Sequence, residues 1–108
     1  MAWKEIETID VLNKLIDDSN TTPQIIFKHS SRCSISALAL SRLQSGSKKF
    51  DIHILDVINY RDISKIVEQK LNVMHQSPQL IIVSNGSCSY QASHMAISSD
   101  VLEKHMLS

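Results

Sequence analysis

Cysteine, glycine and proline are scarce in this sequence, which contains two residues of each among its 108. The two cysteines, Cys33 and Cys88, could form one disulfide, but in a reducing compartment we expect free thiols. With so few glycines and prolines, each one is expected to mark a particular turn or helix end. No low-complexity tract, internal repeat or change of composition indicates a second domain.

The sequence also lacks an excess of positive or negative charge and has no long apolar runs. Eleven basic and eleven acidic residues give a formal net charge of zero. This argues against nucleic acid as the partner, because phosphate binding requires a basic surface. No apolar run approaches the roughly 20 residues of a membrane span, and the first residues, MAWKEIETID, show no signal-peptide pattern. We therefore expect a cytoplasmic protein with no membrane partner.

The chain does contain enough apolar residues for a core, since 43% of its residues are hydrophobic. This suits one compact domain over residues 1–108. Apolar runs bounded by turn residues predict four strands. These strands are residues 24–28, 50–57, 79–84 and 87–92. Asn85-Gly86, between the last two, is a strong signal for a hairpin turn.

Helical spacing of apolar residues predicts four helices, each beginning beside a residue that can cap or open it. These residues are Thr8, Cys33, Asn59 and either Ser98 or Ser99. Gly46 is predicted to end the second helix, with Lys48-Lys49 in a loop after it. Residues 3–6 form either a short strand or an entry segment. The order of elements predicts an α/β fold, in which a central mixed sheet is flanked by helices on both faces.

The stretch QIIFKHSSRCSIS, residues 24–36, places Cys33 at the junction of a buried strand and a helix. At such a junction unpaired backbone N–H groups and the positive end of the helix dipole favour thiolate over thiol. Arg32 and His29 lie nearby in the sequence and also suit a reactive thiol. The alternative is a buried, inert cysteine.

Three separated segments carry a resemblance to a known family. FKHSSRCSIS, HQSPQLIIVSNG and ASH, in this order, resemble the monothiol bacilliredoxins, thioredoxin-like proteins linked to the bacillithiol system. The resemblance covers nearly the whole chain and implies a thioredoxin-like fold, with Cys33 as the redox thiol and a cis peptide bond in Ser77-Pro78. The other matching positions are His29, Ile35, Ser36, His75 and His94. Ser34 stands where the family usually has proline, a residue that influences thiolate stability and the rigidity of the turn.

Ser36 indicates which redox chemistry is expected. A dithiol oxidoreductase would need a cysteine at this position to resolve its own mixed disulfide, and a serine cannot do so. Its hydroxyl is expected to donate a hydrogen bond to the Cys33 thiolate. Cys33 is then predicted to attack a mixed disulfide, release the protein thiol and keep the small thiol until an external thiol removes it.

Cys88 is a poor candidate for a resolving cysteine. Pro78 is expected beside Cys33, and a strand rises ~3.3 Å per residue, which places the Asn85-Gly86 turn roughly 20 Å away. A disulfide requires Cα atoms within about 7 Å of each other. Cys88, just past that turn, is predicted to be a bystander.

The resemblance implies an enzyme, a monothiol thiol–disulfide oxidoreductase that removes a low-molecular-weight thiol from S-thiolated cytosolic proteins. The small thiol, bacillithiol or a similar one, serves as co-substrate, and no tightly bound cofactor is expected. Arg32 is the candidate contact for an anionic thiol, and His29 and His75 are expected to line the cleft. Ser77 and Pro78 are expected to bind a substrate segment through the backbone.

Other functions remain open at this point. A thioredoxin-fold binding module without redox turnover is one alternative, and a dithiol reductase that uses Cys33 and Cys88 is another. His29 and Cys33 have ligand-like spacing, but no second Cys/His pair completes a metal site, so no metal is expected. A phosphatase loop would need arginine at Ala39, and no local signature supports a cysteine hydrolase.

Overall fold

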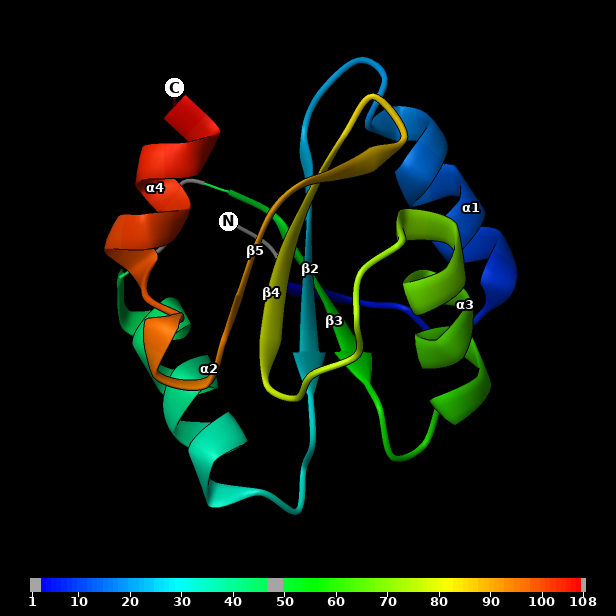
Figure 1. Cartoon of the computed structure of the whole chain (residues 1–108). Helices are drawn as coiled ribbons and strands as arrows, with labels where there is room; N and C mark the ends of the chain where they lie inside the picture. Colours follow the sequence, from blue (N-terminus) through cyan, green and yellow to red (C-terminus); the bar gives the residue numbers. More distant parts are fainter. Residues whose placement is uncertain (1–2, 47–49, 108) are drawn as a thin grey trace.

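The computed structural model describes residues 3–46 and 50–107. Across these residues the chain forms a five-stranded sheet, four α-helices and one short 3-10 helix (Figure 1). The strands are β1 (Trp3–Glu5), β2 (Gln24–His29), β3 (Ile52–Asp56), β4 (Gln79–Ser84) and β5 (Ser87–Ser93). The helices are α1 (Ile9–Asp18), α2 (Ser34–Gly46), α3 (Arg61–Leu71), the 3-10 helix η1 (His94–Ala96) and α4 (Ser99–Leu107).

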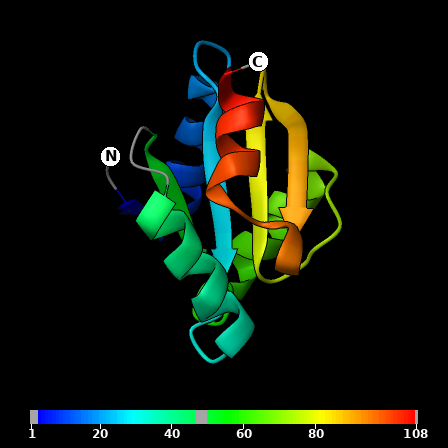
Figure 2. The same ribbon diagram turned by 90° about the vertical axis from the view of Figure 1, so that its left-hand side faces the viewer.

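The sheet is mixed, as the order of elements predicts. Its strand order is β1-β3-β2-β4-β5. Strands β1 and β2 run parallel to β3, whereas β4 is antiparallel to both β2 and β5. Helices α1 and α3 cover one face, and α2 and α4 cover the other (Figure 1, Figure 2). The predicted α/β class with helices on both faces is confirmed.

The central strand β2 contributes to both hydrophobic cores, because successive side chains of a strand point to opposite faces of the sheet. Ile26 packs with the residues of α1 and α3, while Ile25 and Phe27 pack with those of α2 and α4. Burial of each such side chain contributes about 1.5–3 kcal/mol relative to exposure. The end of β2, which leads to Cys33, is therefore held by packing on both faces.

Two of the predicted helix caps are confirmed and one is wrong. The side chains of Thr8 and Ser98 each accept a hydrogen bond from the backbone N–H three residues on, at 3.1 and 3.2 Å. Asn59 does not cap α3, because Tyr60 occupies the N-cap position. The Asn59 side-chain amide instead donates to the Asp56 carboxylate at 2.8 Å, within the turn that follows β3.

The turn at Asn85-Gly86 joins β4 to β5, and both residues have positive φ angles of 54° and 79°. A two-residue hairpin turn of type I′ requires this conformation, so the predicted hairpin is confirmed. Gly46 is the last residue of α2, and Lys48-Lys49 lie outside the described residues. In the part of the chain that is described, no helix has both the length and the apolarity needed to cross a membrane.

Candidate active site

Cys33 lies at the junction of β2 and α2, where the sequence predicts it. Its N–H donates to the Ser30 carbonyl at 3.1 Å, and its carbonyl accepts from the N–H of Ala37 at 3.1 Å. Cys33 therefore occupies the N-cap position of α2, beside the unpaired N–H groups of the first turn, where negative charge is favoured. The residue is half-buried and its thiol is free.

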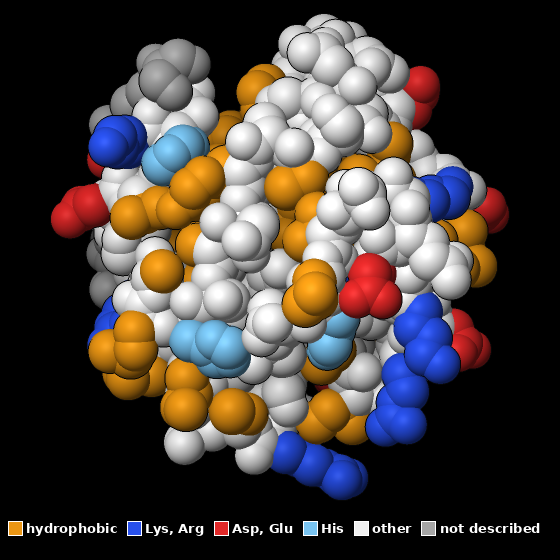
Figure 3. Space-filling model, in the orientation of Figure 1, with side chains coloured by type: hydrophobic (Ala, Val, Ile, Leu, Met, Phe, Trp, Pro, Cys, Tyr) orange, Lys and Arg blue, Asp and Glu red, His pale blue; other side chains and the backbone are white. Residues whose placement is uncertain are grey.

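The surface around the start of α2 is apolar and open. Ile35 and Leu38 are each 49% exposed, and Met95 of the nearby η1 is 70% exposed. Arg32, directly before Cys33, is exposed as well. Figure 3 shows hydrophobic side chains gathered at the lower left of this face and a Lys or Arg side chain at its lower edge. An exposed apolar surface therefore borders the start of α2.

The Ser36 hydroxyl contacts residues that follow or end β2. Its hydroxyl is buried, accepts a hydrogen bond from the Ser30 N–H at 3.0 Å and lies 2.7 Å from Nδ1 of His29. Burial lowers the pKa of His29 from 6.5, with a smaller opposing effect of Asp56. The hydrogen bond from the Ser36 hydroxyl to the Cys33 thiolate stays a prediction. Through Ser30 and His29, Ser36 ties the end of β2 to the first turn of α2.

Replacing Ser36 with alanine should therefore destabilise the fold. The change leaves the Ser30 N–H and the His29 ring without their shared partner, which costs about 1–3 kcal/mol in the free energy of unfolding. Urea unfolding measures this cost. Ser34→Ala, an exposed change in the same turn, is the matched control and should shift the value by less than about 0.5 kcal/mol. Equal effects of the two variants would contradict the role given to the buried hydroxyl.

His29 contacts α2 through this serine. Its ring stacks on Phe27, with centroids 6.0 Å apart, and lines a small cavity together with Asp56 and Tyr60. That cavity of about 190 Å³ lies toward β1 and β3. Through its contacts with Ser36 and Phe27, the side chain of His29 supports the Cys33 turn.

His75, also expected in the cleft, is held against α3. Its Nδ1 lies 3.1 Å from Nζ of Lys28 and 3.3 Å from Oγ of Ser64, and its backbone N–H donates to the Glu68 carboxylate at 2.6 Å. Desolvation and then the Lys28 amine lower the pKa of His75 from 6.5, while Glu68 opposes them. At neutral pH the ring is neutral, its Nδ1 accepts from Lys28, and its Nε2 carries the proton.

Lys28 is a buried charged residue beside the site, and the sequence analysis did not predict its role. It is wholly buried in the central strand, and its Nζ donates to the Ser64 carbonyl at 3.3 Å as well as to His75. Burial lowers the pKa of Lys28 from 10.5 to about 8, with a partial offset from Glu68. A lysine inside the apolar run IIFKH was the available signal, because lysine is almost never fully buried unless it is paired.

Ser77 and Pro78 lie directly before β4, at the end of the sheet where α2 begins (Figure 1, Figure 2). Gln79 pairs with Lys28, so the antiparallel register sets Pro78 opposite His29. The Ser77–Pro78 peptide bond is cis, as the resemblance implies, and Pro78 is buried. The Ser77 hydroxyl oxygen is buried without a hydrogen-bond partner in the described part of the chain.

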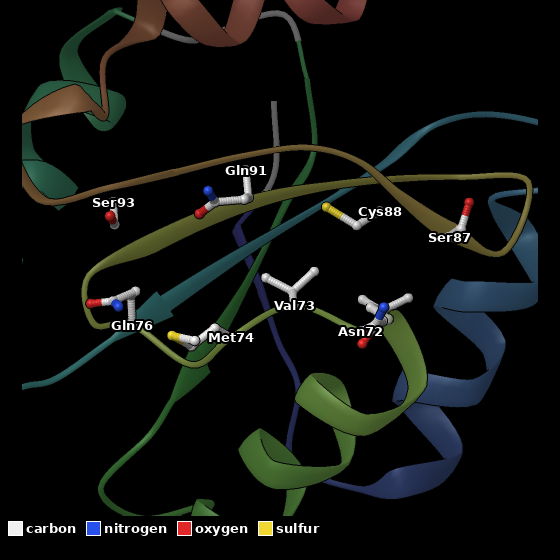
Figure 4. A pocket seen from close by; sticks show the side chains of 9 residues that line it. Asn72, Val73, Met74, Gln76, Ser87, Cys88, Gln91 and Ser93 are labelled. Carbon is white, nitrogen blue, oxygen red and sulfur yellow. The ribbon is translucent and has the colours of Figure 1, made fainter.

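Cys88 lies beside the hairpin turn, at the other end of β4 from Pro78. Its thiol donates to the Tyr90 carbonyl at 3.4 Å, and burial raises its pKa. It lines a groove of about 640 Å³ between β5 and the segment that follows α3 (Figure 4). Both cysteines are free thiols. The six residues of β4 extend over about 20 Å, which places the Cys88 thiol far along the hairpin from the start of β4.

The remaining three histidines have structural contacts. The backbone N–H of His94 donates to the Pro78 carbonyl at 3.1 Å. His53 lies 3.3 Å from the Ile25 carbonyl, and His105 lies 3.0 Å from the Val101 carbonyl. Within residues 3–46 and 50–107, no cluster of three or more His, Cys, Asp or Glu side chains could hold a metal ion.

Solved structures define the class of protein. One of them, described as an inferred oxidoreductase with a thioredoxin fold, is 28% identical over 95% of this chain and 92% of that chain, with a TM-score of 0.86. A thioredoxin variant from Halobacterium salinarum NRC-1 is 9% identical (97% and 88% covered, TM-score 0.75). The thioredoxin of Fasciola hepatica is 14% identical (96% and 96% covered, TM-score 0.71). The chain therefore has a thioredoxin fold.

The family is more specific than the fold. The model of the family described as monothiol bacilliredoxin BrxC matches residues 4–102, and the chain belongs to this family. The family and the fold predicted from the sequence are both confirmed. Together they support thiol–disulfide oxidoreductase activity.

Proposed function

We propose that the chain is a monothiol thiol–disulfide oxidoreductase that removes a low-molecular-weight thiol from S-thiolated cytosolic proteins. The thiol that the family implies is bacillithiol. The observation that carries the proposal is one half-buried thiol, Cys33, at the N-cap of α2, with a serine three residues on. That residue, Ser36, carries a hydroxyl in place of a thiol, so the first turn of α2 offers no second thiol for an internal disulfide.

The reaction is thiol–disulfide exchange, in which one disulfide breaks as another forms. The Cys33 thiolate attacks the small thiol's sulfur in the mixed disulfide, and the protein thiol leaves as a thiolate that takes a proton from water. A second molecule of the small thiol then attacks the adduct, which releases Cys33 and a small-molecule disulfide. The small thiol is thus a co-substrate, and the cycle uses no tightly bound cofactor.

Substrate binding is assigned to the residues that surround the thiol. Ile35 and Leu38 offer an apolar surface to the protein part of the substrate. Arg32 is exposed beside the thiol and suits an anionic group of the small thiol. Ser77 and Pro78, at the start of β4, suit an extended segment that pairs with the backbone.

A transfer experiment tests the proposal. A model protein that carries one mixed disulfide with bacillithiol is incubated with the reduced chain, and intact-mass spectrometry follows both proteins. The model protein should lose the small thiol while the chain gains one adduct of that mass, which peptide mapping places on Cys33. An adduct on Cys88, or an internal disulfide, would contradict the monothiol cycle. Equal and slow alkylation of both thiols would favour a binding module without redox turnover.

A further inference from the structure

A cavity of about 440 Å³ lies between α3, the residues after β3 and the loop before β4, and thiol exchange at Cys33 does not by itself require it. Its volume is within the range of sites for small molecules. Val57 and Ile58 give it an apolar wall. The Val57 N–H donates to the His29 carbonyl at 3.0 Å, and His75, on another rim, is two residues from Ser77. The cavity therefore adjoins the end of the sheet at which α2 begins.

The polar groups of this cavity are mainly donors. Arg61 and Lys65, from the first two turns of α3, are exposed and line it. Figure 3 shows Lys and Arg side chains over the lower part of α3. His75 adds a third donor at Nε2, because its Nδ1 is occupied by Nζ of Lys28 at 3.1 Å. Such a set suits a ligand with acceptor oxygens, and guanidinium and ammonium groups prefer charged ones.

The charges also favour an anion. The amine of Lys28 lies behind the cavity wall, within hydrogen-bonding distance of His75 and the Ser64 carbonyl, and its pKa of about 8 keeps it largely protonated at pH 7. Glu68 is the acidic residue that lines the cavity, and it already accepts the His75 N–H at 2.6 Å. The nearby Asp56 carboxylate is occupied by the N–H groups two and three residues on. The cavity therefore has an excess of positive charge.

We infer that this cavity is a subsite for a carboxylate of the low-molecular-weight thiol, which Arg61 and Lys65 contact while Val57 and Ile58 pack against its carbon skeleton. The inference rests on the proposed function and adds the class of co-substrate: a thiol with a carboxylate several bonds from its sulfur. The other source of such a carboxylate is an acidic side chain of the S-thiolated protein. A reaction without any protein substrate separates the two sources.

The probes are glutathione disulfide and its tetraethyl ester, which differ in carboxylate charge and keep the same peptide skeleton. The rate of adduct formation on Cys33 is measured for wild type, for Arg61→Gln/Lys65→Gln and for the control Lys14→Gln/Lys104→Gln. The control removes the same charge from exposed residues of α1 and α4. The subsite variant should lose about tenfold in rate with the acid, because it removes two charge-assisted hydrogen bonds to the carboxylate. Its rate with the ester should stay within about twofold of wild type, and the control should match wild type with both probes.

Three results would overturn the subsite. The first is a wild type that reacts with the ester at least as fast as with the acid. The second is an equal loss of rate in the subsite variant and in the control. The third is a subsite variant that loses the same rate with both probes. Each of them leaves the thiol chemistry of Cys33 intact. A wild type that gains no adduct from either probe also overturns the subsite. It overturns the proposed function only if the S-thiolated model protein goes unreacted as well.

Discussion

Cys33→Ser is expected to abolish release of the small thiol from an S-thiolated protein, with a loss of about a thousandfold or more. A serine hydroxyl is not ionised at neutral pH and cannot form a disulfide, so neither half of the exchange can occur. Because Cys33 is half-buried and a serine keeps the backbone hydrogen bonds to Ser30 and Ala37, the variant should fold. The release rate is measured from the free thiol that appears on the model protein.

Cys88→Ser is the matched control, since it removes the other thiol of the chain. Its sulfur lies beside the hairpin turn and donates to the Tyr90 carbonyl, and a serine hydroxyl can make the same bond. This variant should keep the wild-type rate within about twofold, as expected for a change away from the reacting atoms. If both single variants lost the activity, a dithiol cycle through Cys33 and Cys88 would replace the monothiol one.

The features that could be predicted from the sequence depend on residues that lie close together in the chain. The Asn85-Gly86 turn follows from the positive φ angles that a two-residue hairpin needs, and the Thr8 cap from a side chain that accepts a nearby N–H. Cys33 at the start of α2 belongs to the same group. Asn59 was misplaced because Asp56, three residues earlier, competes for the same turn and holds the asparagine side chain.

Contacts between residues far apart in the chain could not be read in this way. Lys28 meets Ser64 and His75, which are 36 and 47 residues away, and only the packing of α3 against β2 brings them together. Ser36 shows the same limit over a short range. Its spacing from Cys33 suggests a bond to the thiolate, but the turn after β2 folds back and brings His29 to the hydroxyl. The positions of these residues along the chain could therefore be predicted, but the partners of their side chains could not.

Burial of Lys28 should make the stability of the protein depend on pH in the alkaline range. Its pKa falls from 10.5 to about 8 on folding, so between these values the unfolded chain binds more protons than the folded one. The contribution of Lys28 to the free energy of unfolding therefore rises as the pH increases from about 8 to 10.5. From pH 7 to pH 10 the gain should be on the order of 2 to 3 kcal/mol.

Lys28→Met isolates this contribution, because methionine fills similar space without a titrating group. Urea unfolding of wild type and variant at pH 7 and pH 10 gives the difference in the free energy of unfolding at each pH. Between pH 7 and pH 10 wild type should gain about 2 to 3 kcal/mol of stability relative to the variant, since the other side chains are the same in both proteins. Lys104→Met, at an exposed position of α4, should show no such shift. A difference that stays constant from pH 7 to pH 10 would mean that the Lys28 amine is not desolvated in the folded protein.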